Sequence, residues 1–215
     1  MTSRSSSLTS WSIRVCMFIF AVAVLPGAAT FAVGGGPRVG MPAPDFVGTD
    51  SYGKTVTLSE LRGRTVVLEW SNHGCPFVGK HYRSGNMQAL QKEAVGQGVV
   101  WLTILSSAPG TQGNVTAAEA NELTRSRGAS PTAVILDPSG TIGRAYDART
   151  TPHMFVIDKT GTLVYMGGID DKPTTDVADI ATAKNYVRLA LGAVAAGKPV
   201  QEAVTRPYGC SVKYR

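Results

Sequence analysis

Two apolar strands separated by one helical segment constrain the fold of this 215-residue chain more than any other feature. Residues 65–70 (TVVLEW) and 99–105 (VVWLTIL) are rich in β-branched and apolar side chains, as strands covered on both faces are. Between them, apolar residues recur at helical spacing over 76–94, a pattern weakened by Gly79 and Gly85. This order predicts a parallel strand–helix–strand unit and therefore an α/β domain.

The segments that follow extend this unit into a larger sheet. A capping-box pattern at 116–119 (TAAE) predicts a helix that ends at Gly128, and residues 133–136 predict a third strand. A turn opened by Asp and closed by Gly-Thr joins residues 153–157 to 163–166 as an antiparallel pair. We therefore predict one mixed central sheet flanked by helices.

The two ends of the domain carry weaker patterns. Residues 45–58 alternate about the turn-forming segment 50–53 (DSYG), which predicts an N-terminal hairpin. Apolar residues that recur every three or four positions over 177–194 predict a long amphipathic helix. Residues 197–215 are left as a C-terminal tail.

The N-terminus has the proportions of a signal peptide. Residues 15–25 (VCMFIFAVAVL) form an apolar run of 11 residues, preceded by two arginines and no acid, whereas a transmembrane helix needs about 20 apolar residues. We predict a signal peptide over 1–32 with cleavage near Ala29 or Ala32, followed by a linker over 33–39. The mature protein is then periplasmic or otherwise extracytoplasmic and free of the membrane. An uncleaved membrane anchor is the alternative.

The charge of the chain does not indicate a nucleic-acid partner. The formal net charge is +6, and removal of residues 1–32 with their two arginines lowers it to +4. Lys and Arg are scattered singly, without the basic stripe that tracks a phosphate backbone. We predict no nucleic-acid partner.

Cysteine is the scarce residue on which the chemistry depends. The chain holds Cys16, Cys75 and Cys210, too few for a disulfide-rich scaffold or a four-cysteine zinc site. Export removes Cys16 with the signal peptide and leaves one pair of thiols in a compartment that permits disulfides.

Cys75 stands in the most informative segment, 70–78 (WSNHGCPFV), between the first apolar strand and the first helix. Pro76 suits the first helical position, so Cys75 falls at or beside the N-cap, where free N–H groups and the helix dipole favour a thiolate. Such surroundings lower a cysteine pKa from about 8.5 to roughly 3.5–7.5. His73, Lys80 and His81 are candidates for tuning it further. The alternative is an inert, buried cysteine. Because a helix N-terminus faces solvent and the surrounding residues are polar, we expect Cys75 to be accessible.

This segment, together with Thr151-Pro152-His153 before a strand, resembles the thioredoxin superfamily, specifically its redoxin or peroxiredoxin-like (AhpC/TSA) branch. The resemblance spans about residues 40–196, within which it implies a thioredoxin-like fold. It also implies a cis Thr151–Pro152 bond facing the reactive sulfur, with the preceding backbone free to pair with a substrate. Eight residues are candidates for binding substrate or tuning the thiol: Trp70, Asn72, His73, Pro76, Lys80, His81, Thr151 and Pro152.

The chain departs from its relatives in the residues around Cys75. Thioredoxins carry Cys-x-x-Cys, whereas Val78 stands at the second position here. Peroxiredoxins carry Pro-x-x-x-Thr-x-x-Cys, whereas Leu68 and Asn72 stand at the Pro and Thr positions. The neighbouring resolving thiol is therefore absent. Cys210 is the remaining candidate as a partner of Cys75. The alternatives are a free thiol on a disordered tail and a buried plug.

These observations support two functional hypotheses. The first is an exported thiol oxidoreductase, a thiol-disulfide oxidoreductase or an atypical peroxiredoxin-like antioxidant enzyme, without a cofactor. In it, Cys75 attacks a protein or small-molecule disulfide or a peroxide, and Cys210 resolves the product. The second is a non-catalytic binding module with a structural Cys75–Cys210 disulfide that captures a peptide, copper or zinc. A metal would need His73, His81 and His153 beside Cys75, a spacing that favours no resident metal.

Overall fold

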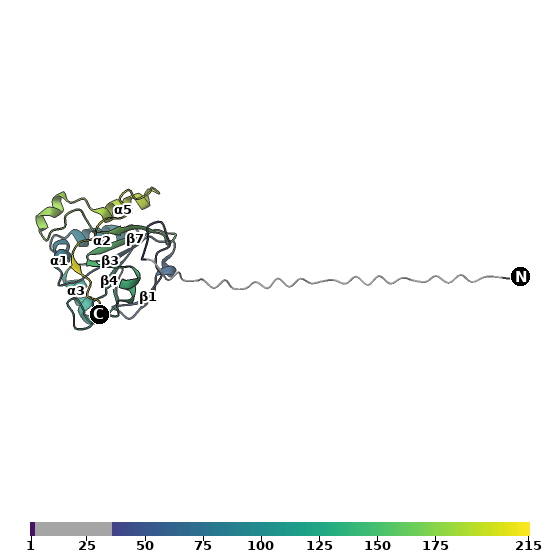
Figure 1. Ribbon diagram of the computed structural model, residues 1–215, viewed down its shortest axis with the longest axis horizontal. Coiled ribbons are helices and arrows are strands. Elements are labelled where there is room, and N and C mark those ends of the chain that lie inside the picture. The colour runs from purple at the N-terminus through teal and green to yellow at the C-terminus, as the bar shows by residue number, and fades with distance from the viewer. Residues whose placement is uncertain (3–35) are drawn as a thin grey trace. The chain divides into compact units, whose positions relative to one another are not determined.

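The computed structural model describes residues 1–2 and 36–215 (Figure 1). The predicted cleavage positions, Cys16, most of the predicted signal peptide and residues 33–35 of the predicted linker therefore lie outside the described residues. Among the described helices, none is long and apolar enough to cross a membrane. All elements below belong to the unit that begins at Gly36 in the described chain.

A seven-stranded mixed sheet forms the centre of the domain, in the order β2-β1-β5-β4-β3-β7-β8. Strands β3, β4 and β5 are parallel, and every other neighbouring pair is antiparallel. The strands are β1 (Val47–Asp50), β2 (Thr55–Thr57), β3 (Val66–Trp70), β4 (Val100–Leu105), β5 (Ala133–Leu136), β7 (His153–Ile157) and β8 (Leu163–Gly167). The predicted mixed sheet, its N-terminal hairpin and its antiparallel β7–β8 pair are confirmed.

Helices cover both faces of this sheet. They are η1 (Leu58–Leu61), α1 (Pro76–Arg83), α2 (Asn86–Gly96), α3 (Ala117–Ser126), α4 (Thr141–Ala145), η2 (Val177–Thr182) and α5 (Tyr186–Ala195), where η marks a 3-10 helix. The capping box predicted for α3 is present, since Thr116 and Glu119 bond each other's side chain and backbone.

Two predicted helices are wrong in their extent. The helix predicted over 76–94 is two helices, because Gly85 adopts a φ of +74° that ends the run between α1 and α2. The long helix predicted over 177–194 is η2 followed by α5, because the backbone is extended at Ala183 and at Asn185. The Asn185 side chain then accepts a hydrogen bond from the Arg188 N–H and caps α5.

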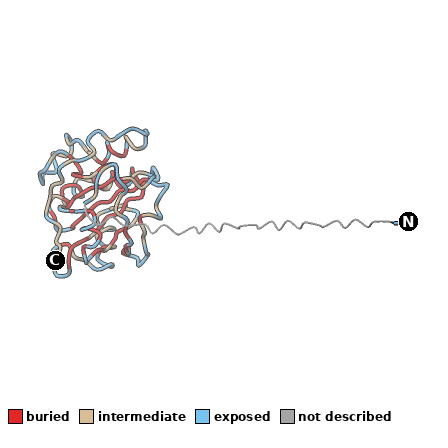
Figure 2. Tube along the Cα trace, turned by 45° about the vertical axis from the view of Figure 1, so that its right-hand side comes forward, coloured by how far each residue is buried: buried red, intermediate tan, exposed pale blue. Residues whose placement is uncertain are grey.

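The core divides into two apolar clusters, one on each face of the sheet. Leu68, Trp70 and Phe155 pack on one face with α4 and η1, and Val67, Trp101 and Met154 pack on the other with α2 and α5. Figure 2 shows the buried residues concentrated along the central strands. Because both faces are covered, the free edge at the carboxyl ends of β3 and β4 is where a site can open.

The C-terminal segment is bound along the domain. Strand β9 (Cys210–Ser211) pairs with β6 (Thr150–Thr151) in antiparallel register, Thr151 opposite Cys210. The Val212 N–H donates to the Arg149 carbonyl at 3.0 Å, and the Lys213 carbonyl accepts from the Ala108 N–H at 2.8 Å. Figure 1 shows this yellow segment beside α1. The alternative of a disordered tail is therefore wrong.

Candidate functional site

The loop that follows β3 presents Cys75 to the site. Asn72 organises this loop: its side-chain oxygen accepts from the Gly74 N–H at 2.9 Å, and its amide donates to the Gln112 carbonyl at 3.1 Å. Cys75 is the N-cap of α1 and Pro76 is its first residue, as the sequence predicts. Asn72 therefore acts on the shape of the loop, and Cys75 stands where the helix dipole favours a thiolate.

The Thr151–Pro152 loop faces the thiol. The peptide bond between these residues is cis, as the family resemblance implies. In its neutral form the Cys75 thiol donates to the Thr151 carbonyl at 3.0 Å. Cys75 is only 1% exposed, so the expectation that a helix N-terminus would leave it facing solvent is corrected: the Thr151 loop and the C-terminal segment cover it.

Cys210 lies beside Cys75, although 135 positions separate them in sequence. The strand pairing places Cys210 opposite Thr151, whose carbonyl accepts from the Cys75 thiol, and each of the two thiols affects the pKa of the other. Gly209 makes this approach possible, because at its φ of +137° a Cβ would collide with the Thr151 carbonyl oxygen. Both described cysteines are free thiols.

The pKa values of the two thiols are shifted in opposite directions. Burial raises the pKa of Cys75, but hydrogen bonds from the Cys210 side chain, the Val78 N–H, the Thr151 side chain and the Cys210 N–H together bring it below the ordinary value. Burial also raises the pKa of Cys210, and the neighbouring Cys75 raises it further, to about 11. Cys75 is therefore the thiol that ionises first.

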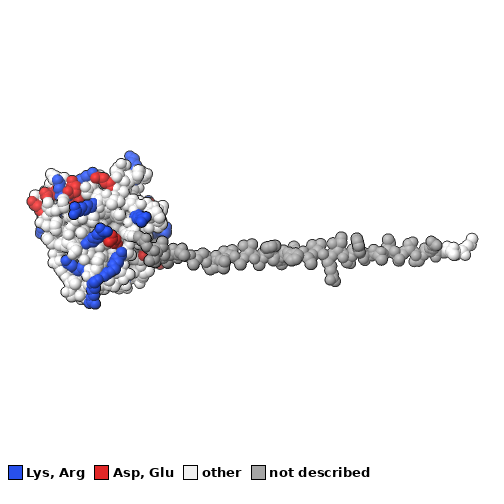
Figure 3. Space-filling view, viewed as in Figure 1, with Lys and Arg blue, Asp and Glu red and all other residues white. Residues whose placement is uncertain are grey.

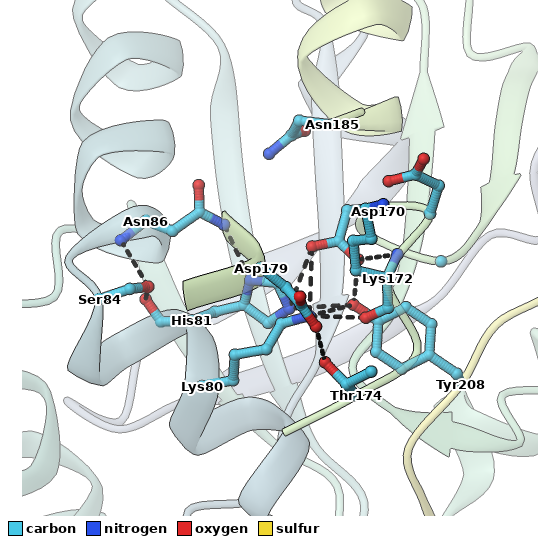
Figure 4. A network of polar contacts seen from close by, with 12 residues as sticks. Lys80, His81, Ser84, Asn86, Asp170, Lys172, Thr174, Asp179, Asn185 and Tyr208 are labelled. Atoms are coloured by element: carbon cyan, nitrogen blue, oxygen red, sulfur yellow. Dashed lines mark hydrogen bonds and ion pairs between the residues drawn. The ribbon is translucent and has the colours of Figure 1, made fainter. Parts of the chain in front are cut away.

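A buried polar cluster anchors the C-terminal segment next to this pair (Figure 4). Tyr208 donates through its hydroxyl to Asp170, and His81 Nε2 lies 3.2 Å from the same hydroxyl. Lys80 Nζ donates to the Lys172 carbonyl at 2.6 Å and lies 3.5 Å from Asp170 Oδ2. Burial lowers the pKa of His81 to about 4, against the opposing effect of Asp170, so the ring is neutral at pH 7.

Three expectations about the tuning residues are corrected by this geometry. Lys80 and His81 are fully buried and contact Tyr208 and Asp170, so they hold the tail instead of facing the thiol. Trp70 is fully buried and donates through its ring nitrogen to Ser106 at 3.0 Å, so it is a core residue without access to substrate. The burial of Lys80 and His81 could not be predicted from the sequence, since a lysine beside a histidine in a helix normally indicates an exposed face.

The histidines are not gathered around Cys75. His73 is exposed beside the thiol, and partial burial followed by the Arg127 charge lowers its pKa. His153 is buried and accepts from the Arg149 N–H at 3.3 Å, while His81 lies in the Tyr208 cluster. Within residues 36–215, no group of three or more His, Cys, Asp or Glu side chains is placed to hold a metal ion.

Sequence reasoning missed Glu69, a fully buried carboxyl on β3. Its oxygens accept from Trp101 Nε1 at 2.9 Å, from Thr103 at 3.1 Å and from Gln91 at 3.1 Å. Burial raises its pKa despite these donors. A single acid within the apolar run 65–70 was the available signal. Glu69 is not among the groups that shift the pKa of Cys75, so it is a structural group of the core.

Together, the mixed sheet, the cysteine at the head of α1 and the proline loop facing it define a thioredoxin-like protein. The family model for Redoxin matches residues 38–184, so the chain belongs to the Redoxin family. Its fold is therefore of the kind used by thiol-based oxidoreductases. Among curated proteins, no sequence match is found.

Two solved structures resemble the whole domain. A hypothetical protein from Sinorhizobium meliloti 1021 is 27% identical, with a TM-score of 0.68, and the match covers 84% of this chain and 97% of that one. An uncharacterized conserved protein from Geobacillus kaustophilus is 25% identical, with a TM-score of 0.69, covering 83% and 93% of the two chains. Neither name states an activity, so a specific function for this chain depends on its own site.

Proposed function

We propose that this protein is a thiol oxidoreductase in which Cys75 is the nucleophile and Cys210 is the resolving thiol. The observation that carries the proposal is the pairing of β9 with β6, which places Cys210 opposite Thr151, the residue whose carbonyl accepts from the Cys75 thiol, while both cysteines are reduced. The tail thus supplies the second thiol that Val78 does not. The Val78 N–H contributes instead to the low pKa of Cys75.

With a disulfide substrate, the reaction has two exchange steps. The Cys75 thiolate attacks one substrate sulfur, which forms a mixed disulfide and releases the other sulfur as a thiolate that takes up a proton. Cys210 loses its proton to water and attacks the Cys75 sulfur, which forms the Cys75–Cys210 disulfide and releases the second thiol. The substrate gains two electrons and the protein loses two; an external dithiol or two thiols return the protein to its reduced state.

A peroxide would use the same pair. The Cys75 thiolate attacks the terminal oxygen, which releases an alcohol or water and leaves a sulfenic acid on Cys75. Attack by Cys210 then forms the disulfide and releases water. Both routes end in the same protein disulfide, so its formation tests the pair independently of the substrate.

The test is the intact mass of the protein after oxidation and quenching. We expect equimolar disulfide or peroxide to remove two hydrogen atoms, that is two protons and two electrons, from the wild type, and peptide mapping to place the bond between Cys75 and Cys210. Cys210→Ser should stop at a mixed disulfide or sulfenic acid on Cys75, and Cys75→Ser should not react. A Cys75 that stays inert in the reduced protein would overturn the proposal and favour the non-catalytic binding module.

We also propose that the protein acts outside the cytoplasm, after removal of a signal peptide over residues 1–32. The support is the short apolar run flanked by arginines and small residues, and a redox pair suited to an oxidising compartment. The N-terminal sequence of the protein from an extracytoplasmic fraction tests this. A new N-terminus near residue 30 or 33 is expected, whereas an intact Met1 in the membrane fraction would indicate an anchor.

A further inference from the structure

A groove opens beside Cys75 on the side of α1 that the C-terminal segment leaves free. Its walls come from the loop before α1, from α1 itself and from the end of α3, and include His73, Arg83 and Arg127. It is open to solvent, with a volume of about 550 Å³. A molecule of modest size can therefore lie next to the thiol.

The groove is positively charged. Two guanidiniums line it, no Asp or Glu does, and neither arginine forms an ion pair within residues 36–215. Arg127 is held in place: its Nη2 donates to the His73 carbonyl at 2.9 Å, and its guanidinium lies 5.0 Å from the centre of the Tyr82 ring. Figure 3 shows Lys and Arg on the visible face in several separate groups, so a local pair of this kind is not part of one basic stripe.

Glycine makes room for the second arginine. Gly79 lies one turn before Arg83 on α1, and a Cβ on Gly79 would collide with the Arg83 guanidinium. Outside the groove, the charge of Glu119 acts to raise the pKa of His73. The Glu119 carboxylate already accepts hydrogen bonds from the Thr116 N–H at 2.7 Å and from the Thr116 hydroxyl at 2.9 Å. Both guanidiniums therefore remain available to an anion.

The other approach to Cys75 is closed to an extended polypeptide. The backbone of Thr150 and Thr151, the edge on which an extended chain would add as a strand, is already paired with Cys210 and Ser211. A polypeptide substrate would have to displace β9 and with it the resolving thiol. The groove, by contrast, is lined by Cys75 and by no residue of the C-terminal segment, so a small molecule can enter it while β9 stays paired.

We propose that the groove binds a small disulfide that carries carboxylates, with Arg83 and Arg127 as its anion-binding residues. This inference rests on the proposed function, because the bound disulfide is the oxidant that Cys75 attacks. The steps are those given above: one substrate sulfur bonds to Cys75, the other leaves as a thiolate, and Cys210 then displaces the first as a thiol. The arginines hold the carboxylates and take no part in the exchange.

The experiment compares three aliphatic disulfides of similar size: the dianion 3,3′-dithiodipropionate, neutral 2-hydroxyethyl disulfide and the dication cystamine. The readout is the second-order rate constant for forming the Cys75–Cys210 disulfide, divided by the rate constant of the same reagent with the urea-unfolded protein to remove its intrinsic reactivity. We expect the normalised order dianion, neutral, dication. Arg83→Gln and Arg127→Gln should each lower the dianion-to-neutral ratio about three- to tenfold.

Arg64→Gln is the matched control, since Arg64 is exposed at the opposite end of β3 and makes only long contacts to the Gly98 carbonyl. It should leave the ratio within twofold. Should Arg127→Gln fail to fold, Arg83→Gln and the loss of wild-type preference with rising salt give the same answer. Equal normalised rates for all three reagents, or a mixed-disulfide peptide that reacts as fast as the dianion, would overturn this inference alone. Failure of every reagent to form the disulfide would overturn the proposed function instead.

Discussion

Cys75 and Cys210 lie side by side, yet their surroundings act on the two thiols in opposite directions. Cys75 caps a helix at the end of a buried strand and receives hydrogen bonds from side chains and backbone, which bring its pKa below the ordinary value. Cys210 sits half-buried on a two-residue strand, where burial and its neighbour raise its pKa to about 11. A difference of position in the fold thus separates two identical side chains into an attacking thiolate and a proton-bearing donor.

The difference also provides an order of events. While Cys75 is a thiolate, its charge and the hydrogen bond it accepts are two of the causes that keep the proton on Cys210. Once Cys75 is bonded to a substrate sulfur, both causes vanish and only burial still raises the pKa of Cys210. In the proposed reaction, Cys210 therefore becomes easier to ionise at the stage when it has to attack.

Replacing each cysteine by serine is the strongest test of the different roles of the two thiols. Cys75→Ser should lower turnover of a disulfide substrate by about 10³-fold or more, because the reacting thiolate is lost. Cys210→Ser should retain the first step and fail in the second, giving one turnover per molecule. Stopped-flow release of the first thiol separates the two variants. Equal losses in the first step would contradict the assignment of distinct roles.

The pH dependence of alkylation measures the difference directly. In the reduced protein, the apparent pKa of Cys75 should lie below that of Cys210, which should lie near 11. At pH 8 a thiol with that pKa is thiolate in only about one molecule in a thousand. Cys210→Ala should raise the pKa of Cys75, because a hydrogen-bond donor is lost, and Cys75→Ala should lower that of Cys210, because the neighbouring thiolate is lost. Peptide mass spectrometry of each site checks this, with the urea-unfolded protein as the reference at which both values converge.

The sheet could be predicted from the sequence because each strand is specified locally. The β-branched runs around Leu68, Ile104 and Val156 allow little but buried strands, and the Asp and Gly of the β7–β8 turn specify a hairpin. The position of Cys75 followed from Pro76 by the same local logic. The ends of the helices are harder to predict. From the sequence alone, Gly85 indicates only a weakened helix, whereas its positive φ ends the helix.

The rest of the site depends on contacts that sequence spacing does not encode. Cys210 meets Cys75 only because the chain after α5 returns across the domain and pairs with β6. Lys80 and His81 are buried only because Asp170 and Tyr208, 89 or more positions away, complete their cluster. A lysine without its partners indicates an exposed face, which is why its role was misassigned.

A substitution that strains the segment before β9 tests whether this strand positions Cys210 for reaction with Cys75. Gly209→Ala should slow closure of the Cys75–Cys210 disulfide about tenfold, because a side chain at a φ of +137° costs about 1–3 kcal/mol and meets the Thr151 carbonyl. Gly197→Ala is the control: its φ is also positive, at +65°, but no atom lies within 4 Å of the added Cβ. It should cost about 1 kcal/mol of stability and leave closure unchanged. Equal closure rates in the two variants would mean that β9 does not position Cys210.

The smallest expected effect comes from a substitution of Tyr208, the residue that anchors β9 through the buried polar cluster. Tyr208→Phe keeps the ring against Phe77, with centroids 5.9 Å apart, but removes the hydroxyl shared by Asp170 and His81. Because Asp170 Oδ2 already lacks a hydrogen-bond partner among the described residues, loss of the hydroxyl leaves this buried carboxylate with one hydrogen bond, from the Lys172 N–H to Oδ1 at 2.9 Å, and with the Lys80 ammonium 3.5 Å from Oδ2.

We therefore expect Tyr208→Phe to lower the free energy of unfolding by about 1–3 kcal/mol and to speed hydrogen exchange at the Val212 amide. Tyr214→Phe is the matched variant, since that hydroxyl donates only to the Ala148 carbonyl, at 2.8 Å; its loss should cost about 0.5–1.5 kcal/mol. Chemical denaturation of the reduced protein gives both values. If Tyr208→Phe costs no more than Tyr214→Phe, the buried cluster does not hold the tail, and the closeness of the two thiols must come from the β6–β9 pairing alone.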